Sequence, residues 1–316
     1  MTNSKLAFVF PGQGSQSVGM LSALAAQFPL VEETFHEAGR SLDYDLWDLV
    51  ENGPEDRLNT TENTQPALLT AGVATWRVWL EQGGLTPALM AGHSLGEYSA
   101  LVCAGSLLFN DAVSLVADRG RLMQSAVPEG EGAMAAILGL DGDELETVCS
   151  RAAEGQIVSP ANFNSPGQIV IAGDTDAVKR AIELAAAAGA KRTILLPVSV
   201  PSHCALMRDA AKEFAERMNN ITIKTPTIQV LHNIDASSRS DATMIKIALA
   251  EQLYQPVRWI ETIKKMKEEG ITHIIECGPG KVLSGLIKRI DRTIEVLPVY
   301  NPPTLVKALE TTRDLD

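Results

Sequence analysis

The segment that most constrains the fold is a Gly-x-Ser-x-Gly pentapeptide, Gly92 to Gly96, set between the apolar run PALMAG and the helix-like pattern SLGEYSALVCAG. Glycines on both sides of a serine allow a sharp strand-to-helix turn, because a side chain beside the bend would clash with neighbouring backbone. Ser94 would then be an exposed nucleophile, and the helix N-terminus would stabilise an oxyanion beside it. The alternative is an ordinary serine N-cap, which predicts no other catalytic group nearby.

Apolar strand-like runs alternate with helical patterns along most of the chain, which is typical of an α/β fold with a mostly parallel, doubly wound sheet. KLAFVF, residues 5–10, ends at Pro-Gly and is interpreted as a buried strand, as is PALMAG. ENTQPALLTAGVATWRVWLEQGG predicts a helix with Pro66 at its first position and a stop at the Gly83-Gly84 pair.

The pattern changes after the Gly/Glu/Pro linker VPEGEG. Residues 129–198 contain strand, helix, two strands, helix and strand, an order typical of a ferredoxin-like βαββαβ unit. A chain of 316 residues is also longer than one core usually serves. We therefore expect a large domain formed by residues 1–127 and 199–316, with a small subdomain, residues 128–198, inserted into it.

Charge and cysteine content narrow the functional classes. The net charge of −12 argues against a general nucleic-acid binder and against attraction to anionic membranes. The cysteines lack zinc-ligand spacing and suit a reducing compartment; they are Cys103, Cys149, Cys204 and Cys277. No run approaches the ~18 apolar residues of a membrane helix, and the N-terminal stretch is too short for a signal peptide. We expect a cytoplasmic monomer without a metal or redox cofactor.

A nucleophilic serine needs a base, and His203 is the favoured candidate. It lies in LPVSVPSHCALM, after a predicted strand and at the start of a helix, where parallel sheets commonly place ligands. The other histidines are expected to be structural or solvated: His36, His93, His232 and His273.

A serine hydrolase would carry an acid between serine and histidine in the chain. No Asp or Glu between Ser94 and His203 follows a convincing strand of the large domain. Either the acid is absent, or another group, such as a backbone carbonyl, orients the histidine. Arg119 and Arg121 are either surface charges or include a buried arginine that binds a carboxylate by two hydrogen bonds.

The glycine-rich stretch FVFPGQGSQS does not fit a dinucleotide-binding loop, because Ser17 stands where the third glycine is required. Gly12 and Gly14 therefore belong either to a flexible turn or to a loop that brings a backbone N–H donor beside the serine.

Several motifs occur together and in order: FVFPGQGSQ, TQPAL, GHSLGEYSAL, RGRLMQ, EGAMAAI, NFNSPGQIVIAG, VPSHCALM, QLYQPVRW and ECGPGKVL. With these, essentially the whole chain resembles the bacterial malonyl-CoA:acyl carrier protein transacylases and, more distantly, the acyltransferase domains of polyketide and fatty acid synthases. The resemblance implies a hydrolase-like α/β domain with a ferredoxin-like subdomain. It also implies transfer of a malonyl group from malonyl-CoA to acyl carrier protein in fatty acid synthesis, with no cofactor.

The resemblance also assigns residues. Ser94 would be the nucleophile and His203 the base, with the backbone carbonyl of Gln252 orienting His203. The backbone N–H groups of Gln13 and Leu95 would form the oxyanion hole. The substrate-binding residues would be Arg119, which pairs with the malonyl carboxylate, and Gln65, Asn162 and Asn164. Leu95 and the VPS stretch before His203 agree with malonyl specificity.

An acidic protein that binds an acidic carrier protein needs a local basic patch. Candidates for carrier docking are Lys281, Lys288, Arg289 and Arg208, although a solvated helix end explains the first three equally well. Three alternative functions remain at this point: a serine thioesterase or esterase, a non-catalytic carrier-binding protein, and a broader acyl-CoA:carrier protein acyltransferase.

Overall fold

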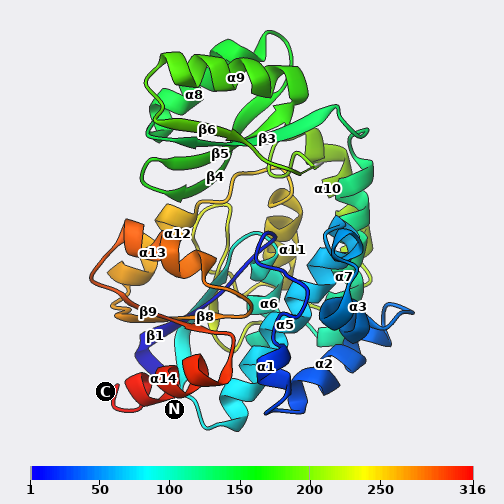
Figure 1. Cartoon of the computed structure of the whole chain (residues 1–316), viewed down its shortest axis with the longest axis vertical. Coiled ribbons are helices and arrows are strands. Elements are labelled where there is room, and N and C mark those ends of the chain that lie inside the picture. Colours follow the sequence, from blue (N-terminus) through cyan, green and yellow to red (C-terminus); the bar gives the residue numbers. More distant parts are fainter. Residues whose placement is uncertain (1, 199, 316) are drawn as a thin grey trace.

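The computed structural model describes residues 2–198 and 200–315, which build two separate sheets (Figure 1). The larger sheet has the order β7-β2-β1-β8-β9, and all its pairings are parallel. Its strands are β1 (Thr2–Phe10), β2 (Thr86–Gly92), β7 (Gln229–Leu231), β8 (His273–Cys277) and β9 (Glu295–Val299). The predicted α/β class with a mostly parallel sheet is confirmed.

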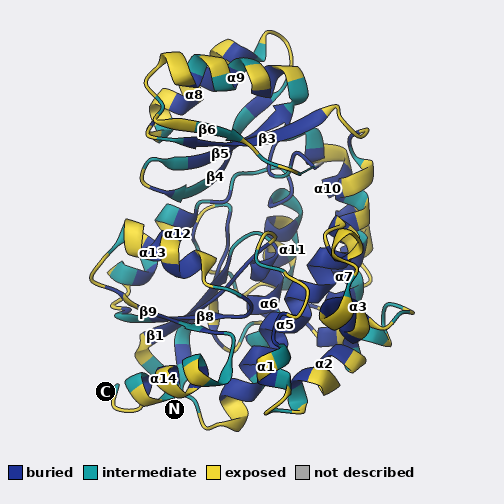
Figure 2. Ribbon diagram, in the orientation of Figure 1, coloured by how far each residue is buried: buried dark blue, intermediate teal, exposed yellow. Residues whose placement is uncertain are grey.

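Both faces of this sheet are buried, so its central strand is apolar at every position from Leu6 to Phe10. Leu6, Phe8 and Phe10 pack on the face covered by α5, α6, α7 and α10, whereas Ala7 and Val9 pack against α12 and α13. Figure 2 shows β1 as buried and the exposed positions concentrated on the surrounding helices. The helices of this part are α1 (Ser22–Ala25), α2 (Leu30–Gly39), α3 (Leu46–Asn52), α4 (Glu55–Leu58), α5 (Thr61–Glu81), α6 (Gly96–Cys103), α7 (Phe109–Ser125), α10 (Arg208–Met218), α11 (Ala242–Glu251), α12 (Trp259–Glu268), α13 (Val282–Ile290) and α14 (Pro302–Thr312), with a short 3₁₀ turn at Ala205–Met207.

The second sheet is antiparallel with the order β4-β5-β3-β6. Its elements follow the chain as β3 (Gly132–Leu138), α8 (Gly142–Ala153), β4 (Val158–Ser165), β5 (Gln168–Asp174), α9 (Thr175–Ala187) and β6 (Arg192–Leu195). This is the ferredoxin-like arrangement that the sequence predicts. The domain boundaries stay a prediction, and residue 199 at one of them lies outside the described residues.

Helices α8 and α9 cover only one face of the second sheet. The other face carries apolar side chains such as Met134 and Val170 and lies towards the larger sheet (Figure 1). Strand β4 is tied to the larger part by reciprocal backbone bonds, from the Phe163 N–H to the Val257 carbonyl at 2.9 Å and from the Val257 N–H to the Ala161 carbonyl at 2.8 Å. A cavity of about 320 Å³ lies between this face and the carboxyl ends of β1 and β2.

One predicted boundary is wrong. Helix α5 begins at Thr61 and contains Pro66 in its second turn instead of at its first position. The missing proline N–H would have paired with the carbonyl of Glu62, an exposed residue, so the helix loses one bond near its solvated end. Among the described residues, no helix has the length and apolar character needed to cross a membrane.

Candidate active site

Ser94 occupies the turn between β2 and α6 in a left-handed backbone conformation, with φ 50°. Neither flanking glycine can be replaced without moving backbone. A Cβ on Gly92 would lie 1.8 Å from the carbonyl carbon of Gly96, and a Cβ on Gly96 would lie 2.0 Å from the carbonyl oxygen of Phe10. A non-glycine residue held at positive φ is strained, and such strain is concentrated at functional sites.

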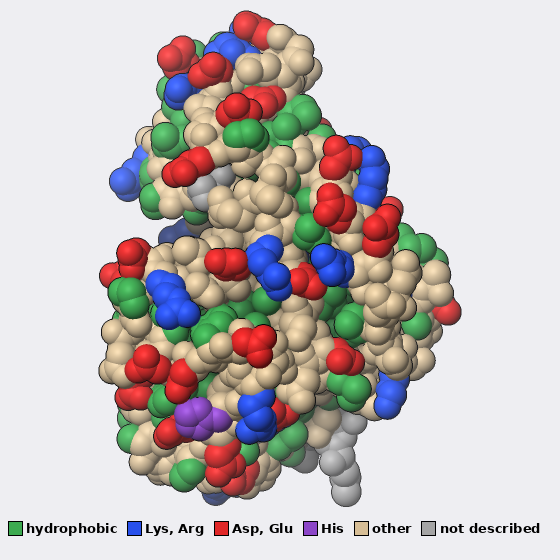
Figure 3. All heavy atoms as spheres, turned by 90° about the vertical axis from the view of Figure 1, so that its right-hand side faces the viewer, with side chains coloured by type: hydrophobic (Ala, Val, Ile, Leu, Met, Phe, Trp, Pro, Cys, Tyr) green, Lys and Arg blue, Asp and Glu red, His purple; other side chains and the backbone are tan. Residues whose placement is uncertain are grey.

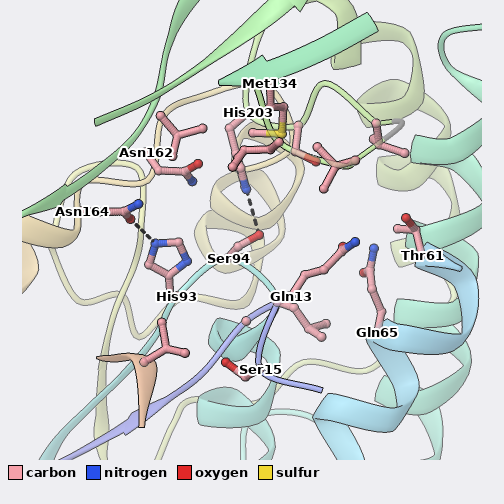
Figure 4. A pocket seen from close by; sticks show the side chains of 18 of the residues that line it. Gln13, Ser15, Thr61, Gln65, His93, Ser94, Met134, Asn162, Asn164 and His203 are labelled. Carbon is pink, nitrogen blue, oxygen red and sulfur yellow. Dashed lines mark hydrogen bonds between the residues drawn. The ribbon is translucent and has the colours of Figure 1, made fainter. Parts of the chain in front are cut away.

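The hydroxyl of Ser94 meets the imidazole of His203, with 2.8 Å between Oγ and Nε2 (Figure 4). His203 Nδ1 lies 2.7 Å from the backbone carbonyl oxygen of Gln252. Because a carbonyl only accepts, Nδ1 carries the hydrogen and Nε2 presents its lone pair to the serine. Burial, and secondly the charge of Arg119, lower the pKa of His203 to about 3, so the imidazole is neutral at pH 7.

Arg119 of α7 is only 2% exposed and points its guanidinium at the same hydroxyl. Nη1 donates to Oε1 of Gln65 at 2.8 Å, and Nη2 donates to Oε1 of Gln252 at 2.9 Å. Nη2 also lies 3.4 Å from Ser94 Oγ. Within the described part of the chain Arg119 forms no salt bridge, and its buried Nε has no hydrogen-bond partner. The site therefore contains a buried positive charge that has no negatively charged partner among the described residues.

Gln13 follows β1 and Leu95 follows Ser94, and both residues line the cavity. The two loops pass so closely that a Cβ on Gly12 would lie 2.4 Å from the carbonyl oxygen of His93. In residues 2–198 and 200–315, neither the Gln13 nor the Leu95 backbone N–H has an acceptor. Two free backbone donors beside a nucleophile suit an oxyanion hole.

Asn162 and Asn164 extend from β4 into the cavity opposite Ser94 (Figure 4). Asn164 Oδ1 lies 2.7 Å from Nε2 of His93, which also packs edge-on against Trp259. Burial lowers the pKa of His93. The sequence predicted His93 to be structural, and its role as a link between the two sheets agrees with that, although the ring also lines the cavity.

Sequence reasoning missed a buried polar cluster beneath the turn, formed by Glu97, His232 and Asn233. Asn233 Oδ1 accepts the Ser94 N–H at 2.7 Å, and its Nδ2 donates to the Gly92 carbonyl at 2.7 Å. Glu97 stands in the first turn of α6, where an acidic residue is common because it favours the helix dipole. Because an acidic residue is ordinary at this position, nothing in the local sequence indicates that Glu97 is buried.

The docking candidates separate into two groups. Lys281, Lys288 and Arg289 are exposed at α13, and Arg289 donates to Gln168 at the edge of the cavity. Arg208 lies on α10, across the molecule from α13 (Figure 1). The face on the right of Figure 1, shown in Figure 3, mixes acidic and basic side chains and carries no continuous basic patch.

The arrangement can perform acyl transfer. It combines a nucleophilic hydroxyl, a neutral imidazole in the correct tautomer, two free backbone donors and an unpaired buried cation. No group of three or more potential metal ligands among His, Cys, Asp and Glu occurs in the described residues.

Known proteins share both the sequence and the fold. Residues 7–304 match the family described as acyl transferase domain. The malonyl CoA-acyl carrier protein transacylase of Salmonella typhimurium is 57% identical over 306 residues, covering 97% of this chain and 99% of the relative. That of Escherichia coli K12 is 57% identical over 307 residues, with the same shares.

Two solved structures extend the likeness to the fold. One is an acyl carrier protein S-malonyltransferase from Vibrio cholerae, with TM-score 0.95, 55% identity, and coverage of 96% of this chain and 99% of that one. The other is a malonyl-transacylase in complex with its type II polyketide synthase acyl carrier protein, with TM-score 0.96, 55% identity, and coverage of 97% and 99%. The chain therefore belongs to the acyl transferase domain family, among the malonyl CoA-acyl carrier protein transacylases.

Proposed function

We propose that this protein transfers the malonyl group of malonyl-CoA to the phosphopantetheine thiol of acyl carrier protein, and so supplies fatty acid synthesis. The observation that carries the proposal is Arg119, a buried cation 3.4 Å from Ser94 Oγ with no carboxylate partner among the described residues. An acyl group that ends in a carboxylate would supply the missing anion by two parallel hydrogen bonds. The names of the relatives point to the same substrate.

In the first half-reaction, His203 Nε2 takes the proton of Ser94, and the oxygen attacks the thioester carbonyl. The N–H groups of Gln13 and Leu95 receive the oxyanion, and each such donor typically contributes about 3–4 kcal/mol. The tetrahedral intermediate collapses, the CoA thiolate leaves with the proton held by His203, and a malonyl ester of Ser94 remains.

In the second half-reaction, the carrier thiol gives its proton to His203 and attacks the ester. The bond to Ser94 breaks, the serine oxygen takes the proton back from His203, and the malonyl thioester of the carrier is released, so two-step ping-pong kinetics follow. A thiolate leaves more easily than an amine, and the imidazolium therefore needs less stabilisation than in a peptidase. This accounts for a backbone carbonyl of Gln252 where a serine protease has a carboxylate. A malonyl carboxylate seated on Arg119 would fill the space from which water could attack the ester.

The decisive experiment is intact-mass spectrometry after mixing with malonyl-CoA alone. We expect one malonyl group per chain, located on Ser94, absent in Ser94→Ala and discharged by carrier protein bearing the pantetheine thiol. Release of free malonate at the same rate with and without carrier would instead support a thioesterase. No adduct at all would support a non-catalytic carrier-binding protein.

We also propose that the protein acts as a monomer in the cytoplasm, with the α13 residues Lys288 and Arg289 at the carrier docking surface. Four free cysteines support a reducing compartment. Sedimentation at micromolar concentration tests the oligomeric state, because a dimer would have twice the mass.

A further inference from the structure

Glu97 is a fully buried carboxylate beneath the Ser94 turn, and no step of the mechanism above uses it. Its Oε1 lies 2.7 Å from Nδ1 of His232. Its Oε2 accepts the backbone N–H of Asn233 at 2.9 Å and a side-chain N–H of Gln252 at 2.8 Å. Burying a charge is costly unless hydrogen bonds compensate for its lost hydration, and here three donors do so.

The bond to Gln252 settles which way its side-chain amide lies. A carboxylate only accepts, so Gln252 must turn Nε2 towards Glu97, and the same nitrogen donates to the Ser94 carbonyl at 3.1 Å. Oε1 is thereby directed at Arg119 Nη2, 2.9 Å away. A flipped amide would place oxygen against carboxylate and N–H against guanidinium. The backbone carbonyl of the same residue accepts the His203 Nδ1–H.

The hydrogen bond from Asn233 to Glu97 also affects the backbone of the nucleophile Ser94, because the Asn233 side chain contacts that backbone. With its backbone N–H fixed by Glu97, Asn233 spans the turn, donating to the Gly92 carbonyl and accepting from the Ser94 N–H, each at 2.7 Å. These two bonds fix the strand-to-helix turn in which Ser94 has φ 50°. A strained conformation persists only where its surroundings over-determine it.

We propose that Glu97 is a positioning residue for the acyl transfer: through Gln252 it fixes His203 and Arg119, and through Asn233 it fixes the backbone of Ser94. The inference rests on the proposed function, because it presupposes that Ser94 and His203 perform the chemistry. The competing explanation is that Glu97 only stabilises the fold, as many buried polar groups do.

The test compares Glu97→Gln with Glu276→Gln in the full chain. Glu276 is equally buried and accepts the N–H groups of Leu283 and Ser284 at the start of α13, so its loss measures the cost of a buried carboxylate outside the cluster. At saturating malonyl-CoA, we expect single-turnover malonylation of Ser94 to slow about 10- to 100-fold in Glu97→Gln, the loss expected for one hydrogen bond to a charged group. Glu276→Gln should lower the Tm without a comparable slowing. Equal slowing in both variants, or an unchanged rate in Glu97→Gln, would overturn the proposal.

A double variant separates positioning from folding. Because Glu97 acts partly through the Gln252 side chain and partly through Asn233, Glu97→Gln combined with Gln252→Leu should lose less rate than the product of the two single losses. Multiplicative losses would mean independent roles and would contradict the proposal.

A spectroscopic readout covers the case in which Glu97→Gln does not fold. The His203 Nδ1–H resonance, assigned with His203→Asn, should move in Glu97→Asp, which keeps the charge but shortens the side chain, and should stay unchanged in Glu276→Gln. An unmoved resonance in Glu97→Asp would overturn the role. A wild-type protein that forms no malonyl-Ser94 would instead overturn the proposed function.

Discussion

At the scale of single residues, specificity depends on Arg119. Its guanidinium contacts two amide oxygens, the serine hydroxyl and the ring of Tyr98, and among the described residues it forms no salt bridge. In Arg119→Ala a malonyl carboxylate would be buried without a counter-charge. We expect the single-turnover rate with malonyl-CoA to fall about 10²- to 10³-fold, as for two charge-assisted hydrogen bonds. Acetyl-CoA should be affected far less, so the ratio of the two rates is the measurement. An unchanged malonyl preference would refute the role.

The same substitution should move the pH dependence of the base. Burial and the Arg119 charge lower the pKa of His203 to about 3, so the rate of Ser94 malonylation in the wild type should be flat from about pH 5 to pH 8. Arg119→Ala removes the cation, so the pKa of His203 rises. The loss of the malonylation rate on acidification should then begin at a higher pH than in the wild type.

Arg119→Lys keeps a positive charge and serves as the control for this second prediction. It should react slowly, because a lysine cannot form the two-pronged contact, yet retain the flat profile. An acid limb at the same pH in both variants would contradict the electrostatic cause.

Some site residues are predictable because local sequence carries their chemistry. Ser94 stands between glycines that have no room for a Cβ, and His203 follows a predicted strand. Glu97 and Asn233 were not predicted as site residues, because their roles depend on contacts between positions 136 residues apart in the chain. The choice between a surface and a buried Arg119 likewise depends on packing that no local pattern encodes.

At the scale of elements, alternating apolar and helical patterns predicted the strands and helices around the site. The patterns predicted less well where an element begins. Helix α5 begins one turn before Pro66. Strand β7 is short, because only Gln229 to Leu231 pair with β2.

Helix α13 carries the docking prediction. Lys288 and Arg289 are exposed in its last turn, and Arg289 contacts Gln168 at the cavity edge. Reversing both charges in Lys288→Glu/Arg289→Glu should raise the KM for an acidic carrier protein about tenfold, mainly through slower association, and leave malonylation by malonyl-CoA unchanged. Steady-state kinetics on each half-reaction measure both effects.

Lys307→Glu/Arg313→Glu reverses the same number of charges at and just after α14, which packs on the opposite face of the larger sheet from α13 (Figure 1). It should leave the KM for carrier nearly unchanged at physiological salt. An equal rise in this control, or equal damage to both half-reactions, would move the docking surface away from α13.

At the scale of the whole molecule, the site exists because two sheets meet. Ser94 and Gln13 follow strands of the parallel sheet, whereas Asn162, Asn164 and Met134 come from the antiparallel one. Sequence patterns predict each sheet separately, but not how they pack. One result of that packing is that two histidines, the half-buried His93 and the buried His203, have lowered pKa values.

The lowered pKa values of these two histidines predict how the stability of the fold depends on pH. In the unfolded chain each histidine has a pKa near 6.5. Below that pH the unfolded state therefore binds more protons than the native state does. The free energy of unfolding should therefore fall as pH drops from about 6.5 towards 5, with a slope of up to about 1.4 kcal/mol per pH unit for each histidine. Urea denaturation at pH 7.0, 6.0 and 5.0 measures this change in the free energy of unfolding.

The raised pKa of buried Glu276 acts in the opposite direction, so the comparison needs a variant that differs only in the histidines. His93→Asn/His203→Asn should lose most of the slope while keeping Glu276 intact. An equal slope in wild type and variant would show that the acid sensitivity arises elsewhere in the fold.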